Sequence, residues 1–167
     1  MKRFFIGILA LFATNPVFAS NLDQNHQNLI RTLESKGVRV VINPEICSRG
    51  FAGAYDPLKS EISVCLDNKF VWTEFDLDTL RHEAHHVVQD CFSGRLGDLN
   101  SKRIFELSVL IKLLSNSTLD IERIEKNYSA MGLDDDRMLM EVEAFLVARY
   151  ATAEKMASTI NRVCESK

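Results

Sequence analysis

One short stretch, His82-Glu83-Ala84-His85-His86, combines residue types and a spacing that specify a chemistry. Residues four apart lie on the same face of an α-helix, so the imidazoles of His82 and His86 can bind one cation. Glu83 lies about 100° round the helix from His82, where its carboxylate can reach a water on that cation without being a ligand. The stretch therefore predicts a metal site with Glu83 as the general base.

Zinc suits these ligands, because it accepts imidazole and carboxylate in tetrahedral geometry and a catalytic site leaves one position to water. The ion lowers the pKa of that water towards neutrality, and the glutamate accepts its proton during attack on a carbonyl. We therefore expect one Zn²⁺ and a hydrolytic activity. A solvated polar helix face is the alternative, since Asp78, His82, His86 and Asp90 recur at four-residue intervals.

A catalytic zinc site needs a third protein ligand, and no histidine follows His86 in the chain. Glu141 and Glu143 are the candidates, and they lie about 200° apart on a regular helix, so at most one can be a ligand. Glu141 shares its face with Ala144 and Ala148, whose small side chains let a second helix approach closely. A buried carboxylate needs a partner, so Glu141 is favoured and Glu143 stays the alternative.

The two motifs together resemble those of the gluzincin zinc metallopeptidases, in which His-Glu-x-x-His is followed by a helix carrying Glu-x-x-Ala. The resemblance rests on residues 81–86 and on Glu141-Val142-Glu143-Ala144. It implies that His82, His86 and Glu141 bind zinc, that Glu83 is the base and that the substrate is a peptide or protein. It also implies a small zincin-like α+β domain, with a short mixed or antiparallel sheet, a metal-binding helix and a C-terminal helical part.

The resemblance leaves two questions open. The group that stabilises the oxyanion could be Tyr55, His85, Tyr128 or Tyr150. The chain could also be a non-catalytic exported metal-binding or interaction protein on the same scaffold. Glu83 favours the enzyme, because a purely structural zinc site has no need of a glutamate at that position.

Residues 1–19 resemble a secretory signal peptide, with Lys2 and Arg3 before the apolar run 4–13 and a small-x-small cleavage motif ending at Ala19. We expect residues 20–167 to form one metallopeptidase domain, secreted or periplasmic, without a stable membrane anchor. Cleavage removes two positive charges and changes the formal net charge from −3 to −5. An acidic domain of this kind argues against nucleic acid as a partner.

Four cysteines remain after cleavage, an even number that predicts two disulfides in an exported protein. Sequence permits three pairings. We favour Cys47–Cys65 with Cys91–Cys164, because the first pair brackets an expected hairpin.

The apolar spacing places these motifs on a coarse order of elements. It predicts a helix over 22–36 with His26 on its surface, and then a strand over 38–42. Two further strands, 51–55 and 61–66, are joined around 56–59, and the first could bind an extended peptide if it lies at the sheet edge, or simply bend at Gly53. The remaining expected elements are a helix capped by Thr73 or Asp76 and ending near Cys91, a helix over 104–114, a short helix that follows a capping box at 117–120 and ends near Tyr128, and one long helix or two over 134–163. Loops 92–100 and 128–135 would set substrate selectivity.

Overall fold

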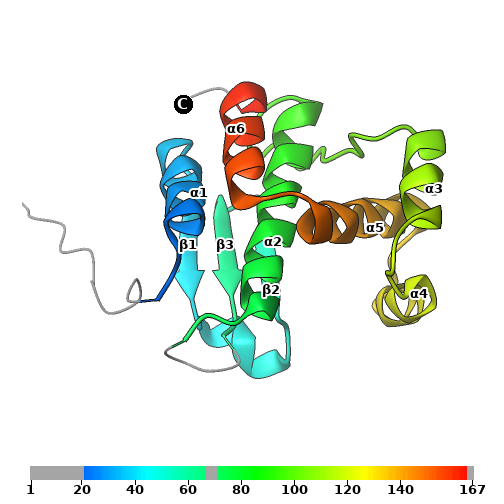
Figure 1. The fold of residues 1–167 in the computed structure, drawn as a ribbon, viewed down its shortest axis with the longest axis horizontal. Helices are drawn as coiled ribbons and strands as arrows, with labels where there is room; N and C mark the ends of the chain where they lie inside the picture. Colours follow the sequence, from blue (N-terminus) through cyan, green and yellow to red (C-terminus); the bar gives the residue numbers. More distant parts are fainter. Residues whose placement is uncertain (1–20, 67–70, 165–167) are drawn as a thin grey trace, which may run out of the picture.

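The structure is a computed structural model that describes residues 21–66 and 71–164 (Figure 1). The predicted signal peptide lies outside these residues. The described chain folds as α+β, with six α-helices, a short 3₁₀ helix and a three-stranded mixed sheet. In order, the elements are α1 (Gln24–Ser35), β1 (Arg39–Ile42), η2 (Glu45–Arg49), β2 (Gly53–Asp56), β3 (Glu61–Val64), α2 (Glu74–Ser93), α3 (Leu107–Ser115), α4 (Ile121–Ala130), α5 (Asp135–Tyr150) and α6 (Ala153–Val163).

The sheet has the order β1-β3-β2, so β2 is an edge strand. β1 runs parallel to β3, and β2 runs antiparallel to β3 with Gly53 opposite Val64. The predicted strands and the turn between the second and third are confirmed. The 3₁₀ helix η2, which precedes β2, was not predicted.

The helices and the sheet divide between two lobes. The sheet lobe consists of α1, the sheet, α2 and α6, and its core includes Leu29, Leu33, Ile62, Leu80 and Ile160. The helical lobe consists of α3, α4 and α5, and its buried core is Leu110, Ile124, Val142 and Leu146. Figure 1 shows α3 and α4 at the far end of α5 from the sheet. The lobes meet where α5 packs on α2.

The C-terminal part is two helices, one of the two alternatives predicted for it. Ala151 is extended, with φ −93° and ψ 139°, and α5 ends there. The hydroxyl of Thr152 then caps α6 by accepting from the backbone N–H of Lys155. The break turns the chain so that α6 returns to pack on α1 and α2.

Both disulfides form as predicted, and both lie in the sheet lobe. Cys47–Cys65 joins η2 to the end of β3, and Cys91–Cys164 joins the C-terminal ends of α2 and α6. Two such bonds indicate an oxidising compartment outside the cytosol. Within the described ranges, no helix has both the length and the apolar character needed to cross a membrane.

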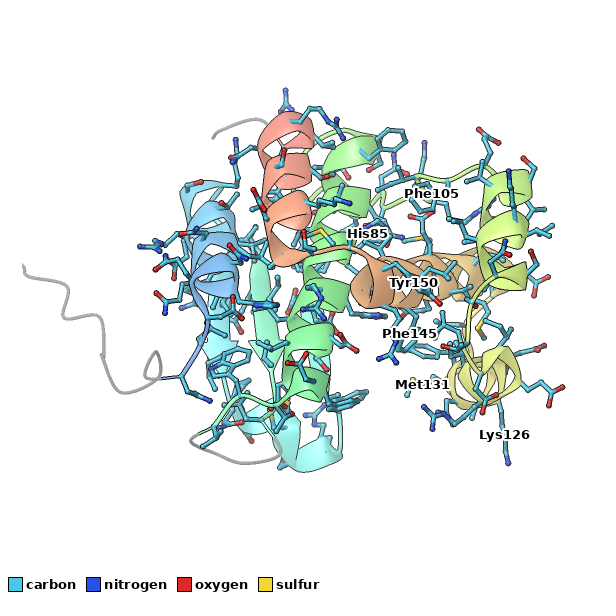
Figure 2. The ribbon with its side chains drawn as sticks, viewed as in Figure 1. His85, Phe105, Lys126, Met131, Phe145 and Tyr150 are labelled. Atoms are coloured by element: carbon cyan, nitrogen blue, oxygen red, sulfur yellow. A yellow bond between two sulfur atoms is a disulfide. The ribbon has the colours of Figure 1, made fainter. Side chains whose placement is uncertain are left out.

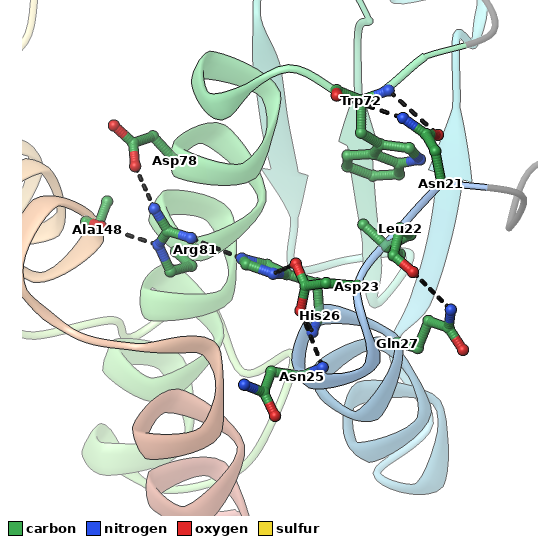
Figure 3. A network of polar contacts seen from close by, with 10 residues as sticks. All are labelled: Asn21, Leu22, Asp23, Asn25, His26, Gln27, Trp72, Asp78, Arg81 and Ala148. Carbon is green, nitrogen blue, oxygen red and sulfur yellow. Dashed lines mark hydrogen bonds and ion pairs between the residues drawn. The ribbon is translucent and has the colours of Figure 1, made fainter.

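The prediction that His26 lies at the surface is wrong, because it is only 7% exposed. Its Nδ1 lies 2.5 Å from Asp23 Oδ2, and its Nε2 lies 2.6 Å from Nη1 of Arg81 on α2 (Figure 3). A guanidinium only donates, so Nε2 accepts and Nδ1 carries the proton. Arg81 also donates from Nε to the carbonyl of Ala148 on α5, at 2.9 Å. The histidine is therefore buried as part of a polar link between α1, α2 and α5.

Candidate metal centre

The helix that carries the histidines, α2, is defined by its N-terminal cap and by two unlike faces. Thr73 and Asp76 form a reciprocal capping box, which confirms the predicted start of the helix. Apolar side chains such as Leu80 and Val87 pack into the core of the sheet lobe. The opposite face, with His82 and the following turn, meets α5 of the helical lobe.

Three side chains from the two lobes converge at this contact: His82, His86 and Glu141. Nε2 of His82 lies 3.1 Å from Nε2 of His86 and 3.2 Å from Oε2 of Glu141. Nε2 of His86 lies 3.5 Å from the same oxygen. Ligand atoms in tetrahedral zinc sites, about 2.0–2.1 Å from the ion, lie about 3.3 Å from one another. These three residues, which we call the metal group, could therefore hold a metal ion.

The electrostatics of the group also favour a cation. Burial lowers the pKa of His86, but its hydrogen bond with Glu141 and the charge of that carboxylate outweigh burial and raise it to about 9. Burial raises the pKa of Glu141, but hydrogen bonds from both histidines outweigh it, and the pKa falls well below its usual range. The negative potential that retains a proton on His86 also attracts a metal ion, which competes with protons for the same nitrogens.

Glu83 lies beside this group and is only 6% exposed. Burial raises the pKa of its carboxyl, and the backbone N–H of Tyr55 on β2, which faces the carboxylate, opposes that rise. A Cβ on Gly53 would lie 3.0 Å from Glu83 Oε1 and 2.6 Å from Thr79 Cγ2. Gly53 is therefore needed for the close approach of β2 to α2, which places the edge strand next to the carboxylate.

The backbone groups of β2 alternate between the sheet and the outside. The N–H of Cys65 donates to the carbonyl of Ala52, which makes this a hydrogen-bonded pair. Such pairs alternate along an antiparallel ladder, so Ala54 also bonds to β3, whereas Gly53 and Tyr55 direct their N–H and C=O groups away from it. The Tyr55 N–H, which faces Glu83, agrees with this alternation.

Gln89 orients His86 from one turn further along α2. Its Nε2 donates to Glu143 Oε1 at 2.9 Å and to the carbonyl of Met140 at 3.2 Å. Its Oε1 therefore faces Nδ1 of His86, 2.8 Å away, and that nitrogen must be the donor. The bond keeps the Nδ1 proton in place, so Nε2, which faces the group, is the nitrogen that gives up its proton to a metal ion. Sequence reasoning missed Gln89, although its place three residues after His86 is on the same helix face.

Glu143, the alternative third ligand, lies apart from this group and is fully buried. Its carboxylate accepts from the backbone N–H groups of Ile104 and Phe105 at 3.0 and 2.8 Å. His85 Nε2 lies 2.8 Å from the same carboxylate. Glu143 therefore holds the connection between α2 and α3 against α5, and it leaves Glu141 as the carboxylate beside the histidines.

The four candidates for oxyanion stabilisation lie in different surroundings. The hydroxyl of Tyr128 on α4 is hydrogen-bonded to Glu141, and burial followed by that charge raises its pKa. The hydroxyl of Tyr55 donates to Asp90 at 2.7 Å. His85 is bound to Glu143, and the hydroxyl of Tyr150 accepts from the N–H of Thr118. Only Tyr128 of these four has its polar atom at the metal group.

A cavity of about 300 Å³ opens at the group, and it is lined by Gly53, Tyr55, Glu83 and Tyr128 among others. A larger one of about 790 Å³ shares His82, Glu83 and Tyr128 and extends between the lobes. Met131, in the loop 128–135, lines both cavities, but no residue of 92–100 lines either. Of the two loops predicted to set selectivity, only 128–135 is therefore next to the group.

Comparison with known proteins identifies a family whose description names no activity. Searches of the curated proteins and of the solved structures find no significant match. Residues 18–164, nearly the whole chain, match the family described as a domain of unknown function, DUF8637. The chain belongs to this DUF8637 family.

Proposed function

We propose that this chain is an exported zinc peptidase of the zincin type, with His82, His86 and Glu141 as ligands. The observation that carries the proposal is the position of Glu83. Its carboxylate is buried, yet it lines the same cavity as the three candidate ligands and is not one of them. A structural metal site has no use for such a carboxylate, whereas hydrolysis requires a base there.

A divalent cation such as Zn²⁺ supplies Lewis-acid activation of water and of the substrate carbonyl in sites of this type. The residues of this chain do the remaining work. Glu83 accepts a proton from the attacking water and later delivers it to the leaving amine, and its burial favours both roles by bringing its pKa closer to neutrality. The phenol of Tyr128 is within reach of the group and would turn its single O–H from Glu141 to the developing oxyanion.

The substrate backbone would bind along β2. The outward N–H and C=O groups of Gly53 and the outward C=O of Tyr55 are available for antiparallel strand addition, which is a common mode of peptide recognition. A peptide held there would lie close to Glu83, because the carboxylate of Glu83 approaches β2 at Gly53. A sheet edge beside a histidine helix is also the arrangement that the gluzincin resemblance implies.

The test is to measure bound metal and peptide hydrolysis on the same samples. We expect one equivalent of zinc in the purified chain and none in His82→Ala/His86→Ala. Glu83→Gln should retain the zinc while kcat for a fluorogenic peptide mixture falls by about 10²–10⁴. Glu74→Gln, at an exposed position in the first turn of α2, is the matched control and should change neither quantity.

Two results would contradict the proposal. Loss of zinc from Glu83→Gln would show that Glu83 is more than a base. Stoichiometric zinc with no hydrolysis of any peptide by the wild-type chain would leave a metal-binding protein without turnover.

A further inference from the structure

The larger cavity forms a groove between the lobes that the metal group only partly occupies. We name it the inter-lobe groove; residues 50–53 and the first turns of α2 form one side, and α4 and the end of α5 form the other. Its volume of about 790 Å³ is in the range of cavities that bind several residues of a ligand. Figure 2 shows Met131 and Phe145 in the space between α2 and α4.

The sides of the groove expose large apolar side chains. Phe51, Phe75 and Met131 are 39%, 55% and 57% exposed, and each lines the groove. Phe145 also lines it and packs against His82, with ring centroids 4.4 Å apart. Exposed aromatic residues gathered around one groove favour an apolar side chain of a ligand as occupant.

The charges on α4 are sorted with respect to this groove. Arg123, Lys126, Asn127 and Ala130 follow the i, i+3, i+4, i+7 spacing of one helix face, and all four line the groove. Glu122 and Glu125 of the same helix do not line it. The helix therefore presents its cations to the groove and directs its acids elsewhere.

The acidic residues that line the groove, apart from the base Glu83, already have partners. Asp78 pairs with Arg81 and Arg149, and Asp120 caps α4 by accepting from the N–H of Arg123 at 3.0 Å. In contrast, the side chains of Arg123 and Lys126 form no ion pair within residues 21–66 and 71–164. Arg123 and Lys126 are therefore the unpaired cations of the groove, while Asp120 keeps its charge but is bound to the N-terminus of α4.

We propose that the inter-lobe groove selects polypeptide segments in which an acidic residue lies near a large apolar one. The apolar side chain enters among Phe51, Phe75 and Phe145, and the carboxylate pairs with Arg123 or Lys126. This inference rests on the proposed peptidase function, because it names the substrate class of the same site. It goes beyond that function because the selecting residues lie on α4, outside the metal group.

The experiment measures binding separately from turnover. Three fluorescent peptides share one sequence with a central Phe and differ only in two neighbouring residues, which are Glu, Gln or Lys. Zinc-loaded Glu83→Gln protein is titrated with each by anisotropy at low salt, and wild-type kcat/KM is measured with quenched versions. We expect the Glu peptide to bind about tenfold more tightly than the Gln peptide, with the difference shrinking at high salt.

Charge reversal locates the effect. Arg123→Glu/Lys126→Glu should reverse the order so that the Lys peptide binds best. Lys112→Glu/Lys155→Glu makes the same change in net charge at exposed positions outside the groove, and it should preserve the original order. Zinc content should be unchanged in both variants, because neither touches the metal group.

The outcomes separate this inference from the proposed function. Equal binding of the three peptides, or an equal loss of preference in both double variants, would overturn the inference even if the protein hydrolyses peptides. Tight, charge-dependent binding to Glu83→Gln without hydrolysis by the wild type would support the inference as a binding property and overturn the peptidase.

Discussion

The two lobes differ in how they are held together, although both contribute to the metal group. The sheet lobe has the larger buried core and both disulfides, and it supplies His82, His86 and Glu83. The helical lobe has a core of four buried side chains and no disulfide among its described residues, and it supplies Glu141 and Tyr128. The candidate ligands therefore come from a disulfide-linked lobe with a large core and from a lobe with a small core, and we expect the second lobe to open more easily.

The strongest way to break this arrangement is to remove Glu143. Glu143→Ala should lower the free energy of unfolding by about 3–5 kcal/mol, because His85 and the amides of Ile104 and Phe105 lose a buried acceptor. Glu141→Ala removes the partner of His82 and His86, so it should cost less, about 1–3 kcal/mol without metal, and it should abolish zinc binding. Urea unfolding with a chelator and elemental analysis measure the two effects. The opposite pattern, with zinc lost only in Glu143→Ala and stability unchanged, would make Glu143 the ligand.

Removing the disulfides tests the rigidity of the sheet lobe. The Cys91–Cys164 bond closes 73 residues and Cys47–Cys65 closes 18. Loop-closure entropy gives about 4 and about 3 kcal/mol for Cys→Ala pairs at these positions. Hydrogen exchange should show the loss in α2, α6 and the sheet, with α3 and α4 little changed. Equal deprotection of both lobes would mean that they unfold as one unit.

Gln89 should affect the metal group more than the fold. Gln89→Met removes the acceptor for His86 Nδ1–H, and loss of such a partner typically weakens metal binding 10- to 100-fold. His85→Leu is the matched control, since it also removes a donor from Glu143 but takes no part in the hydrogen bonds that join His82, His86 and Glu141 to one another or to Gln89. We expect its zinc affinity to stay within about twofold in a competition titration. Similar losses in both variants would assign the effect to Glu143 and not to the tautomer of His86.

The sequence predicted the parts of the site that are local. Two histidines four residues apart, a glutamate between them and a second helix with two acids 200° apart are all readable from helix periodicity. Periodicity also left only two choices for the third carboxylate, and the disulfide pairing followed from an expected hairpin.

The parts that were not predicted depend on contacts between distant segments. His26 looked like a surface residue because its neighbours in α1 are polar, and its partner Arg81 is 55 residues away in the chain. Glu143 looked like a possible ligand because its own helix does not reveal the amides of residues 104 and 105 that surround it. The apolar spacing of 104–146 likewise predicts helices but not that they form a core separate from that of the sheet.

The link through Arg81 offers the smallest and most specific change to the contact between lobes. Its side chain is 11% exposed and joins His26 on α1, Asp78 on α2 and the carbonyl of Ala148 on α5. Arg81→Met keeps the apolar stem but leaves His26 Nε2 and that carbonyl without a donor, and it should lower the free energy of unfolding by about 1–2 kcal/mol. Arg149→Met is the control, because Arg149 also pairs with Asp78 but is 58% exposed, and it should cost under about 1 kcal/mol.

If Arg81 holds the lobes in register for the metal, its loss should also weaken zinc binding, whereas that of Arg149 should not. A destabilised Arg81→Met protein with wild-type zinc affinity would show that the contact between α2 and α5 is sufficient to position Glu141.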